Sequence, residues 1–168
     1  MTTSSVLKSS ATEIKTKGGL QHKDRSELAS QLSSALANSY VLYLKTQSFH
    51  WNVVGPLFYS LHKLTEEQYE DMALAVDTIA ERIRAIGFIA PGSFEQFKEL
   101  AEIKEEAGAP SAEEMIQQLV DDNTTCARLL RDTVIEAEKV NDVTTAGILT
   151  DRIGQHEENA WMLQAILS

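Results

Sequence analysis

The chain contains 168 residues, of which 43% are apolar and 24% are charged, enough for one domain with a substantial hydrophobic core. Twenty-five acidic residues against fifteen basic ones give a formal net charge of -10, which argues against a nucleic-acid-binding surface spread over the whole protein. One cysteine, Cys126, excludes an internal disulfide and a cysteine-based zinc site. The sequence has no signal-peptide pattern and no membrane-span pattern, so we expect a soluble cytoplasmic protein that does not bind membranes.

The first 24 residues differ from the rest in composition and charge. They are rich in Ser, Thr and Lys and show no sustained hydrophobic periodicity, which predicts a flexible, basic N-terminal arm. Residues 1–25 carry five basic side chains against two acidic ones, a net charge of +3. Residues 26–168 carry ten basic and twenty-three acidic side chains, a net charge of -13. The negative charge therefore belongs to the remainder of the chain.

Helical periodicity begins directly after the arm. Apolar and aromatic residues recur at a spacing of three and four, which predicts a long helix over about 25–53. The pair Asp24 and Glu27 has the spacing of a capping box at the start of this helix. Recurring apolar residues predict a second long helix over about 58–86, and Gly87 follows it in a position suited to a C-cap.

The second half of the chain predicts three more helices. A short one is expected near 94–104, and a long one over about 111–138, where a Ser-x-x-Glu sequence after a proline favours a helix start. Asn141 and Asp142 are suited to cap a last long helix that continues almost to the C-terminus. The sequence has no internal repeat and no strand pattern.

These elements predict the fold class. Gly55-Pro56 favours a tight turn, so the first two long helices are expected to be antiparallel neighbours. About 24 residues, including the short helix, join the second and third long helices, which is enough to cross a bundle about 40 Å long. Such a crossover is the connectivity of ferritin-like proteins. Residues 25–168 are therefore predicted to form an all-α, ferritin-like four-helix bundle with a short extra helix in the crossover.

The predicted second helix carries a line of polar residues. His62, Glu66, Asp77 and Glu81 lie within about 100° of one another around the helix axis. Acidic pairs spaced four residues apart are often solvated surface pairs, and this interpretation remains open for each pair alone. Asp77 and Glu81 are nevertheless flanked by core-type residues, and His50 lies near the turn that leads to His62. Imidazole with carboxylates is a ligand set that suits iron and similar divalent metals.

Helix geometry limits how these residues can bind a metal. His62 and Asp77 are separated by about 22 Å of helix, so they cannot share one ion within a chain. In a two-fold dimer with antiparallel second helices, the His62 end of one subunit would face the Asp77 end of its partner. We therefore hypothesise a metal site at a dimer interface. An ordinary bundle-centre site is disfavoured, because no histidine follows a glutamate by three residues.

Three segments of the chain carry longer motifs. They are F-H-W-N-V-V-G-P-L-F at 49–58, D-T-I-A-E-R-I-R-A-I-G at 77–87 and I-G-Q-H-E-E-N-A-W-M-L at 153–163. With His62 placed twelve residues after His50, these segments resemble those of the Dps family (DNA-binding protein from starved cells), the small ferritin-like proteins. The resemblance covers essentially all of residues 25–168.

The resemblance implies a hollow shell of twelve subunits with a two-iron ferroxidase site at each dimer interface. Fe(II) would be oxidised preferentially by hydrogen peroxide, and ferric mineral would be stored inside, protecting DNA from oxidative damage. By position, His50 and His62 correspond to ligands from one subunit, and Asp77 and Glu81 to ligands from its partner. Glu66 falls where the family usually has Asp, which leaves open whether it binds iron directly, through water or weakly.

Other residues have weaker assignments. Trp51 is expected either to orient the site or intercept radicals, or simply to pack. The resemblance suggests an acidic pore through which iron enters, with Asp142 and Asp151 as candidates, although surface carboxylates are common. His22 is expected to be solvated and His156 to be hydrogen-bonded rather than a metal ligand.

The arm resembles N-terminal extensions by which some family members bind DNA. Twelve arms would act multivalently, whereas the acidic body would oppose binding. The alternative function is therefore a nucleoid-associated protein that compacts DNA, with iron oxidation secondary. The candidate DNA-binding residues are Lys8, Lys15, Lys17, Lys23 and Arg25.

Overall fold

The computed structural model describes residues 13, 14, 16 and 18–168, and these form helices and connecting segments with no strand among them. The helices are α1 (His22–Asn52), α2 (Phe58–Ala85), α3 (Phe94–Leu100), α4 (Ala112–Lys139) and α5 (Val143–Ile166). The predicted all-α class, with four long helices and one short helix, is confirmed. Within these residues no helix is long and apolar enough to cross a membrane.

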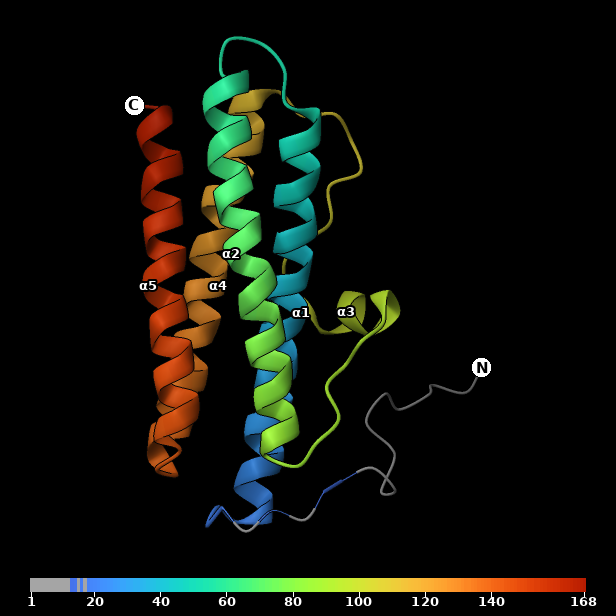
Figure 1. Ribbon diagram of the computed structural model, residues 1–168, viewed down its shortest axis with the longest axis vertical. Helices are drawn as coiled ribbons and strands as arrows, with labels where there is room; N and C mark the ends of the chain where they lie inside the picture. Colours follow the sequence, from blue (N-terminus) through green and yellow to red (C-terminus); the bar gives the residue numbers. More distant parts are fainter. Residues whose placement is uncertain (1–12, 15, 17) are drawn as a thin grey trace.

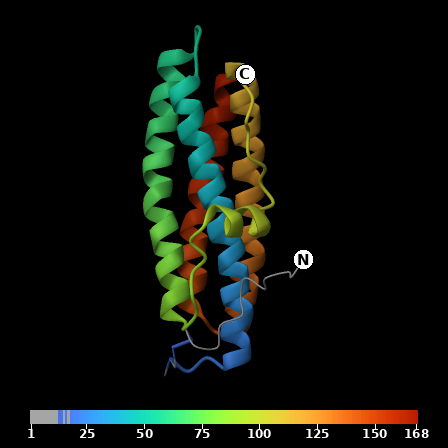
Figure 2. The same cartoon turned by 90° about the vertical axis from the view of Figure 1, so that its right-hand side faces the viewer.

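The four long helices form an elongated bundle (Figure 1). α1 and α2 are an antiparallel pair, α4 and α5 form a second pair, and α1 also packs against α4. The segment after α2 returns along the side of α1 to the opposite end of the bundle and carries α3 halfway, where α3 packs on α1 (Figure 2). The predicted long crossover is therefore present.

Local sequence signals explain three of the helix ends. Ser111 and Glu114 form a full capping box at the start of α4, and Asp142 caps α5 by accepting a hydrogen bond from the Thr145 backbone N–H. After α2, Gly87 has a φ of 103°, a conformation that glycine adopts without strain. These three predictions are confirmed.

The start of α1 differs from the prediction. The helix begins at His22, and its N-cap, Gln21, makes no side-chain capping hydrogen bond. The predicted capping box at Asp24 is therefore wrong, because Asp24 already lies inside the first turn, where a carboxylate favours the helix through its dipole. Lys23 and Arg25 accordingly belong to α1 and not to a flexible arm.

The apolar stripes of the helices meet in two clusters along the bundle. One cluster, in the half that contains the α4–α5 turn, includes Leu28, Leu32, Leu36, Ile79 and Ile83. The other cluster lies near the α1–α2 turn and includes Leu42, Phe49, Leu61, Met72 and Leu119. This second cluster supports the helix ends that carry His50 and His62.

Candidate metal-binding residues

His50 and His62 lie face to face at the end of the bundle where α1 turns into α2. Their ring centroids are 3.8 Å apart and the ring planes differ by 15°. The Nδ1 atom of His50 is 2.8 Å from the backbone carbonyl oxygen of His62. In the same way, the Nδ1 atom of His62 is 2.9 Å from the backbone carbonyl oxygen of His50. Each histidine is thus positioned by the main chain of the other.

This reciprocal contact determines the tautomer of both rings. A carbonyl oxygen only accepts hydrogen bonds, so each Nδ1 must carry the proton and donate it. In a neutral imidazole with Nδ1 protonated, Nε2 has a free lone pair. Backbone hydrogen bonds of this kind orient metal-binding histidines in proteins. Both rings are therefore arranged as Nε2 ligands.

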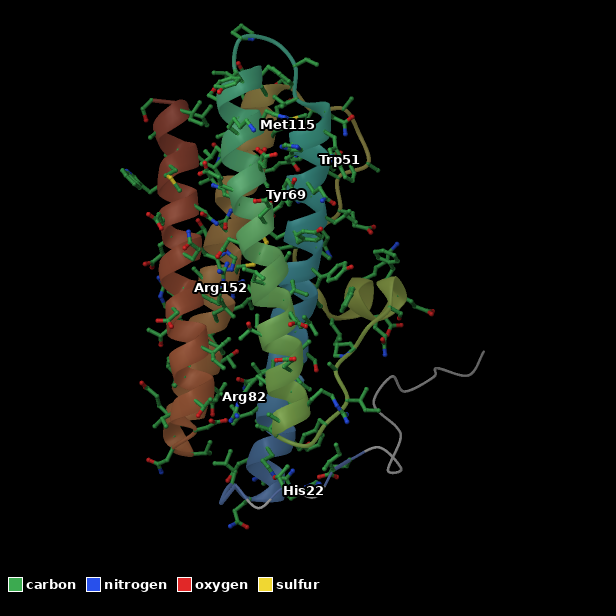
Figure 3. The ribbon with its side chains drawn as sticks, viewed as in Figure 1. His22, Trp51, Tyr69, Arg82, Met115 and Arg152 are labelled. Carbon is green, nitrogen blue, oxygen red and sulfur yellow. The ribbon has the colours of Figure 1, made fainter. Side chains whose placement is uncertain are left out.

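Aromatic rings surround the histidine pair. Phe58 stacks on His62 with centroids 5.0 Å apart, and Tyr69 meets the His50 ring edge-on at 5.2 Å. His50 is only 7% exposed, whereas the Trp51 side chain is 62% exposed. Trp51 therefore does not pack in the interior of its own chain (Figure 3).

Glu66 lies one helical turn after His62. Its carboxylate accepts a hydrogen bond of 2.6 Å from Lys63 Nζ. This hydrogen bond is the main reason that the pKa of Glu66 is lowered, and the charge attraction of Lys63 adds to it against the opposing effect of desolvation. The same pairing raises the pKa of Lys63. Glu66 is therefore ionised at neutral pH, and a metal ion would compete with Lys63 for it.

Asp77 and Glu81 lie on the same helix but well away from the histidines. Both are exposed and stand one turn apart. Fifteen residues of helix separate Asp77 from His62, about 22 Å. Across residues 13–14, 16 and 18–168, no three His, Cys, Asp or Glu side chains are grouped closely enough to hold a metal ion. Within one chain, then, the predicted ligands stay in two separate groups, one where α1 turns into α2 and the other farther along α2.

Apolar side chains accompany these candidate ligands on the exposed surface of α2. Tyr59 and Leu74 are each 73% exposed, and Phe58 is 44% exposed. At 100° per residue, Tyr59 and Leu74 fall at about 60° and 120° from His62, next to Asp77 and Glu81 at about 60° and 100°. This face of α2 therefore combines apolar contact area with carboxylates.

The two candidate pore residues have different surroundings. Asp142 is 4% exposed and accepts hydrogen bonds from Arg82 Nη2 at 2.6 and 2.8 Å and from the Thr145 hydroxyl at 2.6 Å. Its carboxylate thus joins α2 to the start of α5 (Figure 3 labels Arg82), and its place in an iron-entry pore stays a prediction. Asp151 is exposed on α5 and stays a prediction.

Of the candidate DNA-binding residues, Lys8, Lys15 and Lys17 lie outside the described part of the chain. Lys23 is exposed in the first turn of α1. Arg25 is 8% exposed, donates from Nη1 to the carbonyl oxygen of Ile86 at 2.8 Å, and has its guanidinium 5.7 Å from the centre of the Phe88 ring. The prediction for Arg25 is corrected, because its side chain ties α1 to the segment after α2.

The other two histidines agree with their expected roles. His156 is buried, and its Nδ1 lies 2.8 Å from Asn123 Oδ1. Burial, aided by the charge of Arg152, lowers the pKa of His156 to about 3, so its ring stays neutral. His22 is exposed and pairs with Glu13 at 3.0 Å.

Tyr69 was missed by the sequence reasoning, although its position two helical turns after His62 places it on the same side of α2.

Comparison with known proteins adds the family. Residues 29–168 match the ferritin-like domain family. The crystal structure of a Dps protein from Vibrio cholerae, described as a member of the ferritin-like diiron-carboxylate proteins, superposes with a TM-score of 0.87 at 33% identity and covers 92% of this chain and 97% of its own. The chain belongs to the Dps family. The sequence resemblance is therefore confirmed.

Other Dps proteins and relatives support this membership. A Dps structure from Bacillus brevis has a TM-score of 0.85 at 35% identity, with 89% of this chain and all of that chain covered. The DNA protection during starvation protein of Brevibacillus brevis is 38% identical over 136 residues, covering 81% of this chain and 91% of the relative. A low temperature-induced protein of Nostoc is 44% identical over 151 residues, covering 89% and 84%.

Proposed function

We propose that this Dps-family chain oxidises Fe(II), preferentially with hydrogen peroxide, at two-iron sites formed between two copies of the chain. The ferric product would be stored inside a hollow shell of twelve subunits, which would protect DNA from oxidative damage. Iron is the substrate and the cargo in this proposal. The observation that carries it is the reciprocal hydrogen bonding of His50 and His62, which leaves two adjacent Nε2 lone pairs free.

The remaining ligands would come from the partner subunit. Asp77 and Glu81 are exposed on α2 and are too far along the helix to reach a metal held by His62. Antiparallel pairing of two α2 helices about a two-fold axis would bring them opposite the histidines, once in each direction. Burial of Tyr59 and Leu74 in that interface would remove apolar surface from water and favour the dimer.

The ligand chemistry suits iron oxidation. Neutral imidazoles hold Fe(II), while the negative charges of Asp77 and Glu81 stabilise Fe(III) more strongly than Fe(II) and so lower the energy of the oxidised state. Two neighbouring irons supply two electrons to one peroxide molecule, which is then reduced to water without release of hydroxyl radical. Glu66, which lies beside the histidines and is ionised, would neutralise further positive charge.

Mixing of two inactive variants tests the shared site. The variant H50A/H62A lacks the histidine end, and the variant D77N/E81Q lacks the carboxylate end. In a mixed dimer, one of the two sites carries every defect and the other is intact. Random reassembly of equal amounts should therefore restore about a quarter of the wild-type sites, measured as peroxide-dependent Fe(III) formation.

Two controls make the result unambiguous. The variant E67Q changes an exposed carboxylate that neighbours Glu66 and should oxidise iron at the wild-type rate. Size-exclusion chromatography of each variant checks that the oligomer still forms. If the mixed oligomers regain no activity while each parent assembles normally, the site is not shared between subunits and the proposal is wrong.

DNA binding is a second candidate function, favoured by the charge of +3 carried by residues 1–25 against the acidic remainder. With Arg25 engaged in the bundle, the candidates become Lys8, Lys15, Lys17 and Lys23. Weak contacts from twelve arms would add up, since attachment of one arm raises the effective concentration of the others. The relative from Brevibacillus brevis is named a DNA protection during starvation protein, which is consistent with a function at DNA.

A gel-shift series tests DNA binding. Replacement of the four lysines by glutamine should remove binding to duplex DNA at low salt, and wild-type binding should weaken steeply as salt rises. The variant K104Q, which changes one exposed lysine in the crossover, is the control for loss of a lysine outside the arm. Equal binding by the four-lysine variant and the wild type would refute a role for the arm.

A further inference from the structure

A group of polar side chains is buried in the interior of the bundle, where α2 faces α5. Gln68 on α2 is 3% exposed and Asn159 on α5 is 1% exposed. Seven buried side-chain nitrogen and oxygen atoms in the described part of the chain have no hydrogen-bond partner, and five of them belong to Gln68, Arg152 and Asn159. Buried polar atoms almost always have a partner in native proteins. The concentration of five such atoms at one place therefore indicates a bound molecule.

Helix geometry brings these side chains together along one seam between α2 and α5. Arg152, His156 and Asn159 are three or four residues apart, so they share one side of α5. Arg152 Nη1 donates a hydrogen bond of 2.7 Å to Asp71 Oδ2 on α2. Gln68 precedes Asp71 by three residues, so its amide lies about one turn along α2 from the Arg152 guanidinium (Figure 3 labels Arg152, midway along the bundle). The unpartnered atoms of the two helices thus lie at neighbouring levels of the bundle.

His156 adds a hydrogen-bond acceptor to this seam. The amide nitrogen of Asn123 donates to the Leu119 carbonyl oxygen at 2.8 Å, so the oxygen of that amide faces His156. This oxygen lies 2.8 Å from His156 Nδ1 and can only accept, so Nδ1 carries the proton. Burial and the charge of Arg152 lower the pKa of His156 to about 3, so the ring is neutral and Nε2 has a free lone pair. Among the residues that the structure describes, none donates a hydrogen bond to this Nε2.

The unpartnered groups of the seam include both donors and acceptors. Arg152 offers donors at Nε and Nη2, and Asn159 offers one at Nδ2. His156 Nε2 and Gln68 Oε1 are acceptors. The positive charge of Arg152 disfavours a metal cation beside it, whereas the acceptor lone pairs and the charge of Asp71 on Arg152 disfavour a small anion. A water molecule accepts two hydrogen bonds and donates two, which is the combination that these groups need.

We propose that ordered internal water occupies the seam between Gln68, Arg152 and His156. The central water accepts hydrogen bonds from Arg152 and Asn159 and donates to His156 Nε2 and to Gln68 Oε1. Such water is part of the folded structure, because it removes the cost of leaving buried polar atoms unpaired. The site lies inside one chain and apart from the candidate iron ligands. Gln68 is about 200° around α2 from Glu66, on the other side of the helix.

This water connects three helices of the bundle. α5 packs mainly on α4 and only lightly on α2. Through the water, the ion pair of Asp71 with Arg152 becomes continuous with the hydrogen bond between His156 and Asn123, which joins α5 to α4. The water also allows a neutral histidine and an arginine to be neighbours in the interior, because its oxygen turns toward the guanidinium and one hydrogen toward the ring. The seam is therefore a specific polar connection between α2, α5 and α4.

Crystallography of the full chain at high resolution tests the site directly. An ordered water should lie within about 3 Å of both His156 Nε2 and a guanidinium nitrogen of Arg152. In the variant Q68L, which has a similar side-chain volume but no polar atom, this water should be lost or displaced. The control Q164L replaces an exposed glutamine of α5 and should keep it. Oxygen-17 relaxation dispersion in solution should show fewer long-lived waters per chain in Q68L than in the wild type and Q164L.

Three results would overturn the proposal. The first is a crystal structure in which the Gln68 amide bonds directly to Arg152 or Asn159 and no solvent lies between them. The second is an anomalous bromide peak at the seam in crystals soaked in sodium bromide, which would make the ligand an anion. The third is an unchanged number of long-lived waters in Q68L when size-exclusion chromatography shows that the variant elutes as the wild type does. If Q68L does not fold, the wild-type crystal structure and the bromide soak decide by themselves.

Discussion

His50 and His62 each donate from Nδ1 to the backbone carbonyl oxygen of the other, at 2.8 and 2.9 Å. We expect nitrogen-15 solid-state NMR of the metal-free protein to show Nδ1 protonated and Nε2 unprotonated in both rings. Addition of Zn²⁺, as a redox-inert stand-in, should shift the two Nε2 resonances and leave the Nδ1 protons in place. Detection of an Nε2–H in either ring would contradict this arrangement.

The ion pair between Arg82 and Asp142 predicts the effect of acid and of mutation. Desolvation alone would raise the pKa of Asp142, but the hydrogen bonds from Arg82 and Thr145 outweigh it and lower this pKa. Its contribution to stability is therefore present above the carboxyl pKa of the unfolded chain and is lost as pH falls through the lower folded value.

The variant D142A should lower the free energy of unfolding by about 3–5 kcal/mol, because it leaves Arg82 without its charge partner and removes the cap of α5. Urea denaturation at pH 7 measures this change. D151N, on the exposed side of α5, should change stability by less than about 0.5 kcal/mol. Equal stability of D142A and the wild type would show that the pair contributes nothing.

The buried His156 is expected to make the stability of the protein depend on pH in a second way. Its folded pKa of about 3 lies below the ordinary value of 6.5, because the neutral ring is buried against Asn123. Below pH 6.5 the unfolded chain therefore binds a proton that the folded chain does not, and stability falls as pH falls. Between pH 7 and pH 5 this contribution amounts to about 2 kcal/mol.

The variant H156Q should lose this pH-dependent part. The glutamine amide retains a donor for Asn123, so the folded protein at pH 7 should keep most of its stability. Urea denaturation at pH 7 and pH 5, at one protein concentration, gives the difference. The control H22Q changes an exposed histidine and should keep the wild-type difference. An unchanged difference in H156Q would exclude His156 as its source.

At Gly87 the structure leaves no room for a methyl group. A Cβ there would lie 2.5 Å from the carbonyl oxygen of Ile14 and 2.8 Å from Arg25 Nη1, at a φ of +103°. The variant G87A should therefore lose about 1–3 kcal/mol of stability. The variant G147A, in α5 with nothing within 4 Å, should gain about 0.5–1 kcal/mol. Thermal denaturation measures both, and a stable G87A would contradict the close approach.

The helices were predictable because their signals are local. A Ser-x-x-Glu capping box, a glycine after the second helix and apolar residues every three or four positions act within one or two turns of chain. The start of α1 lies about three residues earlier than predicted. Arg25, in the first turn of α1, contacts the Ile86 carbonyl and the Phe88 ring, which lie more than sixty residues away and which no local pattern indicates.

In the candidate site, too, local spacing was predictable and contacts between distant residues were not. The spacing of His50 and His62 indicated that they meet across a turn, and helix geometry indicated that Asp77 and Glu81 stay apart from them. The sequence indicated Asp142 as a helix cap and as a candidate pore residue, but not its ion pair with Arg82, which lies sixty residues earlier. No local pattern reports such a pairing between distant positions.

The sequence by itself determined the all-α architecture, the crossover and the separation of the predicted ligands into two groups along α2, because helix period and rise follow from the backbone alone. Only the tertiary structure decided which side chains are committed to holding the bundle together and which remain free. The tautomers of His50 and His62 and the contact of Tyr69 with His50 arise where α1 and α2 pack side by side. Such contacts depend on the distance between helices, which no pattern along one chain contains.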